Sequence, residues 1–101
     1  MIPKRGAAAR ARVLSDFEHG KAGAENAECI LRRERRCGDE RLVLLLTRWR
    51  DAEARADVAF EVMTRRGLGA GREESRFQRA EERADNAWVR VRDYAQKAVG
   101  K

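Results

Sequence analysis

A stretch of thirteen residues occurs twice in this chain, and the interval between the two copies constrains the fold. Residues 48–60 read RWRDAEARADVAF, and residues 76–88 read RFQRAEERADNAW. Seven of the thirteen positions keep the same residue, and the two aromatic residues of each copy exchange places. The interval of 28 residues equals four heptads, so both copies carry the seven-residue period of helices that pack against one another.

The heptad period extends beyond these copies and predicts two long helices, at residues 39–66 and 72–99. Apolar residues recur every three or four positions in both segments, as they do on the buried face of a helix. Gly38 precedes the first segment, and the glycine-rich residues 67–71 between the two segments predict a turn. We therefore expect a long antiparallel, coiled-coil-like hairpin in which Trp49 lies near Trp88 and Phe60 lies near Phe77.

The N-terminal third of the chain predicts a further helical segment at residues 7–36. Gly20 and Gly23 each cost about 1 kcal/mol relative to alanine inside a helix, so we expect a break near residues 20–23. Residues 1–6 contain the single proline and are interpreted as a flexible basic arm. A chain of 101 residues forms one domain. The sequence as a whole predicts an all-α, three-helix bundle built on the hairpin.

Five consecutive apolar residues at positions 42–46 exceed what one face of a helix can bury. Leu42, Leu45 and Leu46 belong to the stripe that faces the second long helix. Val43 and Leu44 define a second apolar face, which must be covered by the N-terminal helix, by a second copy of the chain or by a partner protein.

The residue inventory argues against an enzyme. The chain contains one histidine and two serines, and its glycine-rich segment lacks the lysine of a phosphate-binding loop. Cys29, Cys37 and His19 do not complete a four-ligand zinc site. We therefore expect a non-catalytic protein without a metal and without a cofactor.

The sequence also lacks the usual signals for a membrane. No apolar run reaches the roughly 18 residues of a membrane span, and no apolar segment follows the basic N-terminus as it does in a signal peptide. We therefore expect a cytoplasmic protein without membrane contact, in which the two cysteines stay reduced.

The charge of the chain is unevenly distributed. It has 23 basic and 17 acidic residues, which gives a net charge of +6. The excess is concentrated in two clusters, which are Lys4, Arg5, Arg10 and Arg12, and then Arg32, Arg33, Arg35 and Arg36. Both clusters can neutralise phosphates, so nucleic-acid binding is one interpretation. Acidic residues are spread between the bases, however, and no helix reads as an unbroken basic face.

A short helical bundle with an excess apolar face and no catalytic motif is typical of proteins that act by presenting a surface. We therefore expect a protein-binding module that is a stoichiometric inhibitor or adaptor of a larger assembly, such as a nucleoprotein complex, or that forms a homodimer. The expected contact surface comprises Arg32, Arg33, Arg35, Arg36, Val43 and Leu44. In size and lack of motifs the chain is similar to small proteins of phages and mobile elements, anti-CRISPR proteins among them, many of which block a host machine.

Overall fold

The computed structural model describes residues 7–19, 24–65 and 71–99. These residues form four α-helices and no strand: α1 at Ala7–Glu18, α2 at Ala24–Glu34, α3 at Glu40–Arg65 and α4 at Gly71–Val99. The predicted all-α helical bundle is therefore confirmed for this part of the chain. The predicted arm at residues 1–6, the break near residues 20–23 and most of the turn at residues 67–71 lie outside the described residues. No helix among the described residues combines the length and apolarity needed to cross a membrane.

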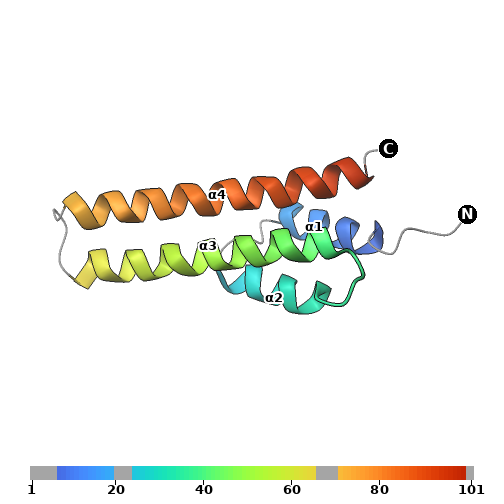
Figure 1. Cartoon of the computed structure of the whole chain (residues 1–101), viewed down its shortest axis with the longest axis horizontal. Coiled ribbons are helices and arrows are strands. Elements are labelled where there is room, and N and C mark those ends of the chain that lie inside the picture. Colours follow the sequence, from blue (N-terminus) through green and yellow to red (C-terminus); the bar gives the residue numbers. More distant parts are fainter. Residues whose placement is uncertain (1–6, 20–23, 66–70, 100–101) are drawn as a thin grey trace, which may run out of the picture.

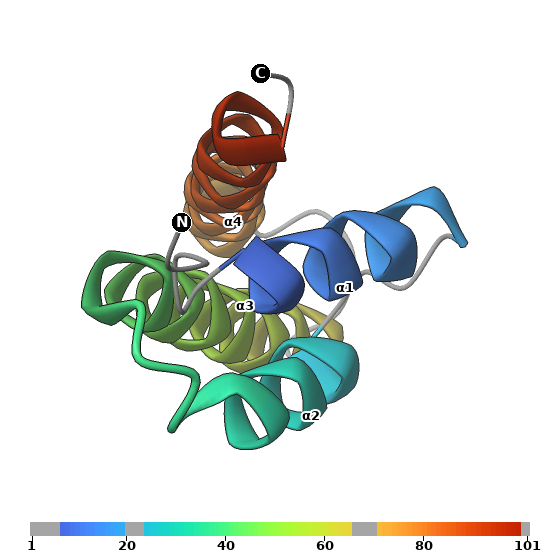
Figure 2. The same cartoon turned by 90° about the vertical axis from the view of Figure 1, so that its right-hand side faces the viewer.

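The helices form an elongated rod with both short helices at one end. α3 and α4 lie side by side and run in opposite directions (Figure 1). α1 packs against α4, and α2 packs against α3, near the end where α3 begins and α4 ends. Figure 2 shows that the short helices leave the opposite side of the α3–α4 pair uncovered. The N-terminal segment thus contributes two helices with different packing partners, so the described residues form four helices where a three-helix bundle was predicted.

Aromatic rings join α1 to the α3–α4 pair. The ring centroid of Phe17 lies 5.4 Å from that of Trp49, edge to face, and 5.1 Å from that of Trp88. Trp49 is fully buried, and aromatic contacts of this kind add about 0.5–1.5 kcal/mol to the burial of the rings. Farther along the pair, the centroids of Phe60 and Phe77 are 5.3 Å apart. The buried core contains Ala9, Val13, Ala27, Ile30, Leu31, Leu42, Leu45, Leu46, Trp49 and Val91.

The five apolar residues at positions 42–46 are divided between the core and the surface. Leu42, Leu45 and Leu46 are buried. Val43 is half-buried and packs against the core, so the chain itself covers the second apolar face at this position. Leu44 remains 47 % exposed.

Asp39, the residue before α3, joins three helices. Its Oδ1 accepts the backbone N–H of Leu42 at 3.1 Å, as an N-cap residue does at the start of a helix. Its carboxylate also forms an ion pair with Arg10 of α1 and accepts the hydroxyl of Tyr94 of α4 at 2.9 Å. Gly38, with a φ of 89°, adopts the left-handed conformation that brings the chain to this position.

A second buried carboxylate joins α1 to α2. Glu34 is fully buried, and it accepts hydrogen bonds from Arg12 at 2.7 and 2.9 Å and from Arg33 at 2.6 Å. Arg33 also pairs with Asp16 of α1 at 2.7 Å. These contacts satisfy a buried charge that would otherwise be costly, and they fix α1 against α2.

Both buried carboxylates titrate at a lower pH than usual. Burial alone would raise the pKa of Glu34 and of Asp39. The hydrogen bonds that each carboxylate accepts, together with the neighbouring guanidinium charges, outweigh burial and hold both pKa values below their usual range. A carboxyl group whose pKa is lowered by folding stabilises the native state above its unfolded pKa, and this stabilisation is lost as the pH falls.

We expect the protein to lose stability as the pH falls below about 4.3, the pKa of an unfolded glutamate. The substitution Glu34→Gln should lower the free energy of unfolding at neutral pH by roughly 1–3 kcal/mol, because Arg12 and Arg33 lose the buried anion that they hold. The substitution should also reduce the loss of unfolding free energy between about pH 7 and pH 3, which denaturant titrations at each pH measure. A variant with the acid dependence of the wild type would contradict this role of Glu34.

Candidate functional site

Seven basic residues of α3 and α4 fall on one flank of the helix pair. They form two rows in which successive members are seven residues apart: Arg41, Arg48 and Arg55 on α3, and Arg76, Arg83, Arg90 and Lys97 on α4. Residues seven apart lie on the same face of a heptad helix. Most of these bases directly precede a buried residue of the seam between the helices, namely Leu42, Trp49, Ala56, Ala84 and Val91. Each row therefore borders the seam.

The two rows form the walls of a groove between the helices. Three pairs of cations, with one member on each wall, line common pockets: Arg41 with Lys97, Arg48 with Arg90, and Arg55 with Arg83. Adjacent pockets share lining residues, so they form one continuous groove. The α4 wall spans the 21 residues from Arg76 to Lys97, about 31 Å at 1.5 Å per residue. We call this feature the basic groove; its cations are Arg41, Arg48, Arg55, Arg76, Arg79, Arg83, Arg90 and Lys97.

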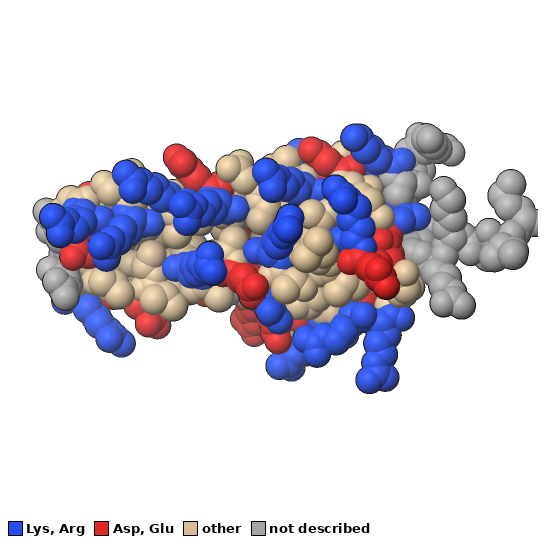
Figure 3. All heavy atoms as spheres, in the orientation of Figure 1, with Lys and Arg blue, Asp and Glu red and all other residues tan. Residues whose placement is uncertain are grey.

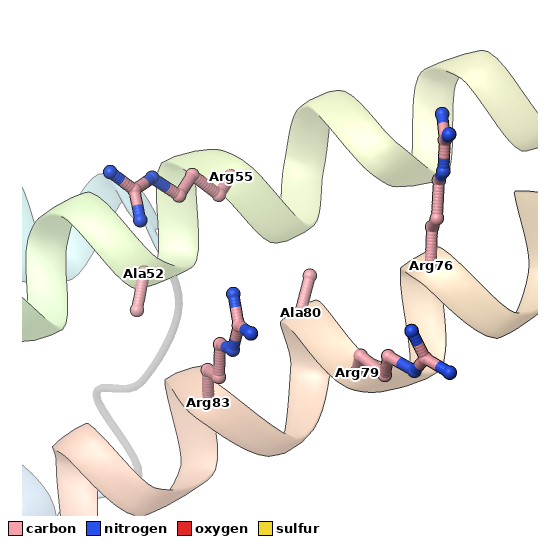
Figure 4. Close-up of a pocket in the computed structure, with 6 residues that line it drawn as sticks. All are labelled: Ala52, Arg55, Arg76, Arg79, Ala80 and Arg83. Atoms are coloured by element: carbon pink, nitrogen blue, oxygen red, sulfur yellow. The ribbon is translucent and has the colours of Figure 1, made fainter.

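The floor of the basic groove consists of small or apolar side chains, which are Leu45, Ala52, Ala80 and Ala87. Figure 4 shows Ala52 of α3 and Ala80 of α4 pointing into the space between the two helices, at different positions along the pair. Arg76 and Arg83 extend from α4 toward α3 in the same view. Figure 3 shows Lys and Arg side chains gathered along the face of the α3–α4 pair that lies toward the viewer. The groove is therefore a narrow apolar channel between walls of positive charge.

Like charges face each other across the basic groove. All eight cations are exposed, and none forms an ion pair with another residue in the described part of the chain. Two acidic residues, Glu73 and Asp93, also line the groove, one toward each end. Positions that flank the seam of paired helices usually carry opposite charges, whereas like charges there cost a few tenths of a kcal/mol per pair. An anion in the groove removes that cost.

The opposite flank of the same helix pair is acidic. Glu53 lies there among other carboxylates, which are Asp57, Glu81 and Asp85. Burial raises the pKa of Glu53, and the surrounding carboxylates raise it further. The indole N–H of Trp49 donates to Glu53 at 3.2 Å and partly offsets this shift. Among the described residues, no group of three or more His, Cys, Asp or Glu side chains is arranged to hold a metal ion.

Of the predicted N-terminal nucleic-acid residues, Arg10 and Arg12 do not line this groove. Lys4 and Arg5 lie outside the described residues. Arg10 is only 8 % exposed, and both Arg10 and Arg12 are held in ion pairs with buried carboxylates. Arg10 therefore stabilises the fold, and its burial makes it inaccessible to a phosphate.

The predicted partner-binding arginines are only partly available. Arg33 is held by Asp16 and Glu34. Arg32 pairs with a residue of its own helix, Glu28, at 3.1 Å. The other two arginines, Arg35 and Arg36, are exposed. Together with Val43 they line a pocket at the turn between α2 and α3. None of these residues lines the basic groove.

The sequence reasoning missed the basic groove because bases and acids alternate along the chain. The bases of the groove recur every seven residues, whereas most of the acids occupy other heptad positions. The expectation that no helix carries an unbroken basic face overlooked α4, which contributes four bases at one heptad position. The signal for the groove is visible when the charged residues are grouped by heptad position rather than by distance along the chain.

We expect salt to stabilise this protein, because ions screen the repulsion across the basic groove. Raising NaCl from about 20 mM to about 500 mM should raise the melting temperature by roughly 4 °C, which corresponds to about 1 kcal/mol in a domain of this size. The variant Arg48→Gln/Arg90→Gln removes one cation pair, so it should melt higher than the wild type at low salt and depend less on salt. Scanning calorimetry measures both effects, and a wild-type melting temperature that falls with salt would contradict the repulsion.

Comparisons with known proteins give no family to which the chain belongs. No family model, no curated protein and no solved structure matches it. The chemistry of the basic groove therefore carries the functional proposal on its own.

Proposed function

We propose that this chain is a non-catalytic nucleic-acid-binding protein and that the basic groove binds the phosphate backbone. In this proposal α3 and α4 act as an antiparallel, coiled-coil-like hairpin that holds two rows of cations at a fixed separation. The observation that supports the proposal is the pairing of exposed cations across the groove: Arg41 with Lys97, Arg48 with Arg90, and Arg55 with Arg83.

A repeating polyanion matches the basic groove better than a single small anion does. Each wall presents a cation about every 10 Å, and the longer wall extends for about 31 Å. Nearly all of these cations are arginines, whose planar guanidinium groups bind phosphate oxygens through two parallel hydrogen bonds. A nucleic-acid backbone is a regular linear array of negative charges, and its binding releases condensed counterions.

Nucleic acid was also one ligand that the sequence predicted, but at a different site. The sequence favoured the clusters at residues 4–12 and 32–36, because the bases there lie close together along the chain. Arg10, Arg12 and Arg33 are instead tied to buried carboxylates of the core. The cations of the groove have no such partner among the described residues and are free to bind a ligand.

Replacing Arg48, Arg83 and Arg90 with glutamine should weaken the binding of a labelled oligonucleotide on the order of tenfold or more at about 100 mM salt. Each lost phosphate contact lowers the slope of log Kobs against log salt concentration by about 1, so the salt dependence should also become flatter. Fluorescence anisotropy at several salt concentrations measures both quantities, with single-stranded and duplex probes in parallel.

The matched control removes the same charge elsewhere. The variant Arg32→Gln/Arg35→Gln/Arg36→Gln also loses three positive charges, but none of them lines the basic groove, so it should retain most of the affinity. Circular dichroism checks that both variants are folded. An equal loss of affinity in the two variants would mean that net charge alone drives binding, and it would remove the groove from the site.

Binding of a protein partner is a second candidate function, and exposed apolar side chains on α3 support it. Leu44, Val58 and Val62 are 47, 61 and 38 % exposed. Val58 and Val62 also line the pocket at the end of the basic groove that lies away from the short helices. In this role the chain acts as a stoichiometric inhibitor or adaptor, or a second copy of the chain covers the apolar surface.

The variant Val58→Asp/Val62→Asp should stay folded, because both side chains are exposed, and it should lose any protein partner of this surface. If the partner is a second copy, the wild type should sediment as a dimer at about 100 µM and the variant as a monomer. If the wild type is a monomer, the partner of this surface is a different protein rather than a second copy. Dimers of both proteins would contradict the role of this surface.

A further inference from the structure

We infer that the basic groove takes a single strand of nucleic acid that runs along the helices, rather than a duplex. This inference rests on the proposed function, because it specifies the form of nucleic acid that the groove binds. Three features support it: the width of the channel, the apolar floor between the cation pairs, and an aromatic ring at one end.

The basic groove is narrow and has cations on both sides. It lies between two helices whose axes are about 8–10 Å apart when they pack in this way, and its floor includes Ala52 and Ala80. A strand that lies in this channel is contacted from both walls, for example by Arg48 and Arg90. A duplex displays its backbones on a convex surface, separated by grooves about 6 and 12 Å wide, so it reaches only the tips of the walls.

Apolar side chains form the floor between the cations along the channel. A cavity of about 190 Å³ lies beside Arg83 and Arg90, and its floor contains Leu45 and Ala87. An unpaired base has an apolar face that fits such a floor, and arginine guanidinium groups stack on base faces. The amide of Asn86 also lines this cavity, where it supplies both a donor and an acceptor for the edge of a base.

The channel ends at an aromatic ring. Tyr94 lines a cavity of about 420 Å³, together with Arg41, Arg48, Arg90 and Lys97. Its hydroxyl donates to Asp39 at 2.9 Å, which holds the ring in place. The guanidinium of Arg41 lies over this ring, with its Cζ 5.9 Å from the ring centroid. Guanidinium groups and aromatic rings both stack on unpaired bases, so this cavity suits a base at one end of the strand.

Charge alone predicts the opposite preference. A duplex carries one negative charge per about 1.7 Å of its axis, roughly twice the density of a stacked single strand. A surface that recognises only charge therefore binds a duplex at least as tightly as a single strand of the same length. A preference for the single strand requires the channel and its pockets.

The test compares three labelled probes of about 12 units, which exceed the roughly nine stacked nucleotides that the channel accommodates. The probes are oligothymidine, a blunt duplex, and an abasic strand with the same number of phosphates. By fluorescence anisotropy at about 100 mM salt, we expect oligothymidine to bind on the order of tenfold more tightly than either other probe. A duplex or an abasic strand that binds as tightly overturns the inference and leaves the proposed function intact. The absence of salt-dependent binding by every probe overturns the proposed function itself.

A conservative variant separates stacking from charge. Arg83→Lys/Arg90→Lys keeps both charges but loses the planar guanidinium groups. We expect it to reduce the difference between oligothymidine and the abasic strand severalfold while the salt dependence stays unchanged. The variant Arg83→Gln/Arg90→Gln should instead flatten the salt dependence by about 2. A lysine variant with the wild-type preference for oligothymidine overturns the placement of bases between these two residues.

Discussion

The carboxylate of Asp39 is the interaction on which the arrangement of the helices depends. It caps α3, pairs with Arg10 of α1 and accepts the hydroxyl of Tyr94 of α4. Because these contacts lie together at one end of the rod, α1 is fixed there, and Glu34 in turn joins α2 to α1. The α3–α4 pair extends well beyond both short helices (Figure 1). The covered end holds most of the buried core, whereas the rest of the pair stays open to solvent.

An uncovered flank is what the basic groove requires. α1 packs on the flank that bears Trp88, through Phe17, and leaves the basic rows free. Alanines in the seam, such as Ala52 and Ala80, keep the floor of the groove low between the two walls. The repulsion between the walls is tolerated because burial elsewhere holds α3 and α4 together. The same two helices therefore provide stability on one flank and a surface of exposed cations on the other.

The heptad pattern predicted the features that depend on local periodicity. It placed the long helices at residues 39–66 and 72–99, within one residue of the observed ends of Glu40–Arg65 and Gly71–Val99. It did not predict that Arg10 and Glu34 are buried, because ion pairs between residues far apart in the sequence are decided by how α1 docks. The basic groove was not predicted from the sequence for another reason. Its cations belong to two helices and become neighbours only when the helices pair.

The separation of charge across the α3–α4 pair also gives the molecule a transverse electric dipole. One flank carries the bases of the groove, and the other carries the carboxylates around Glu53. Within a Debye length of roughly 8–10 Å, a polyanion exerts a torque that turns the basic flank toward it and the acidic flank away. In the proposed function, this torque corrects encounters that begin in an unproductive orientation before contact is made. Productive encounters with a nucleic acid would then be more frequent than the net charge of +6 alone would produce.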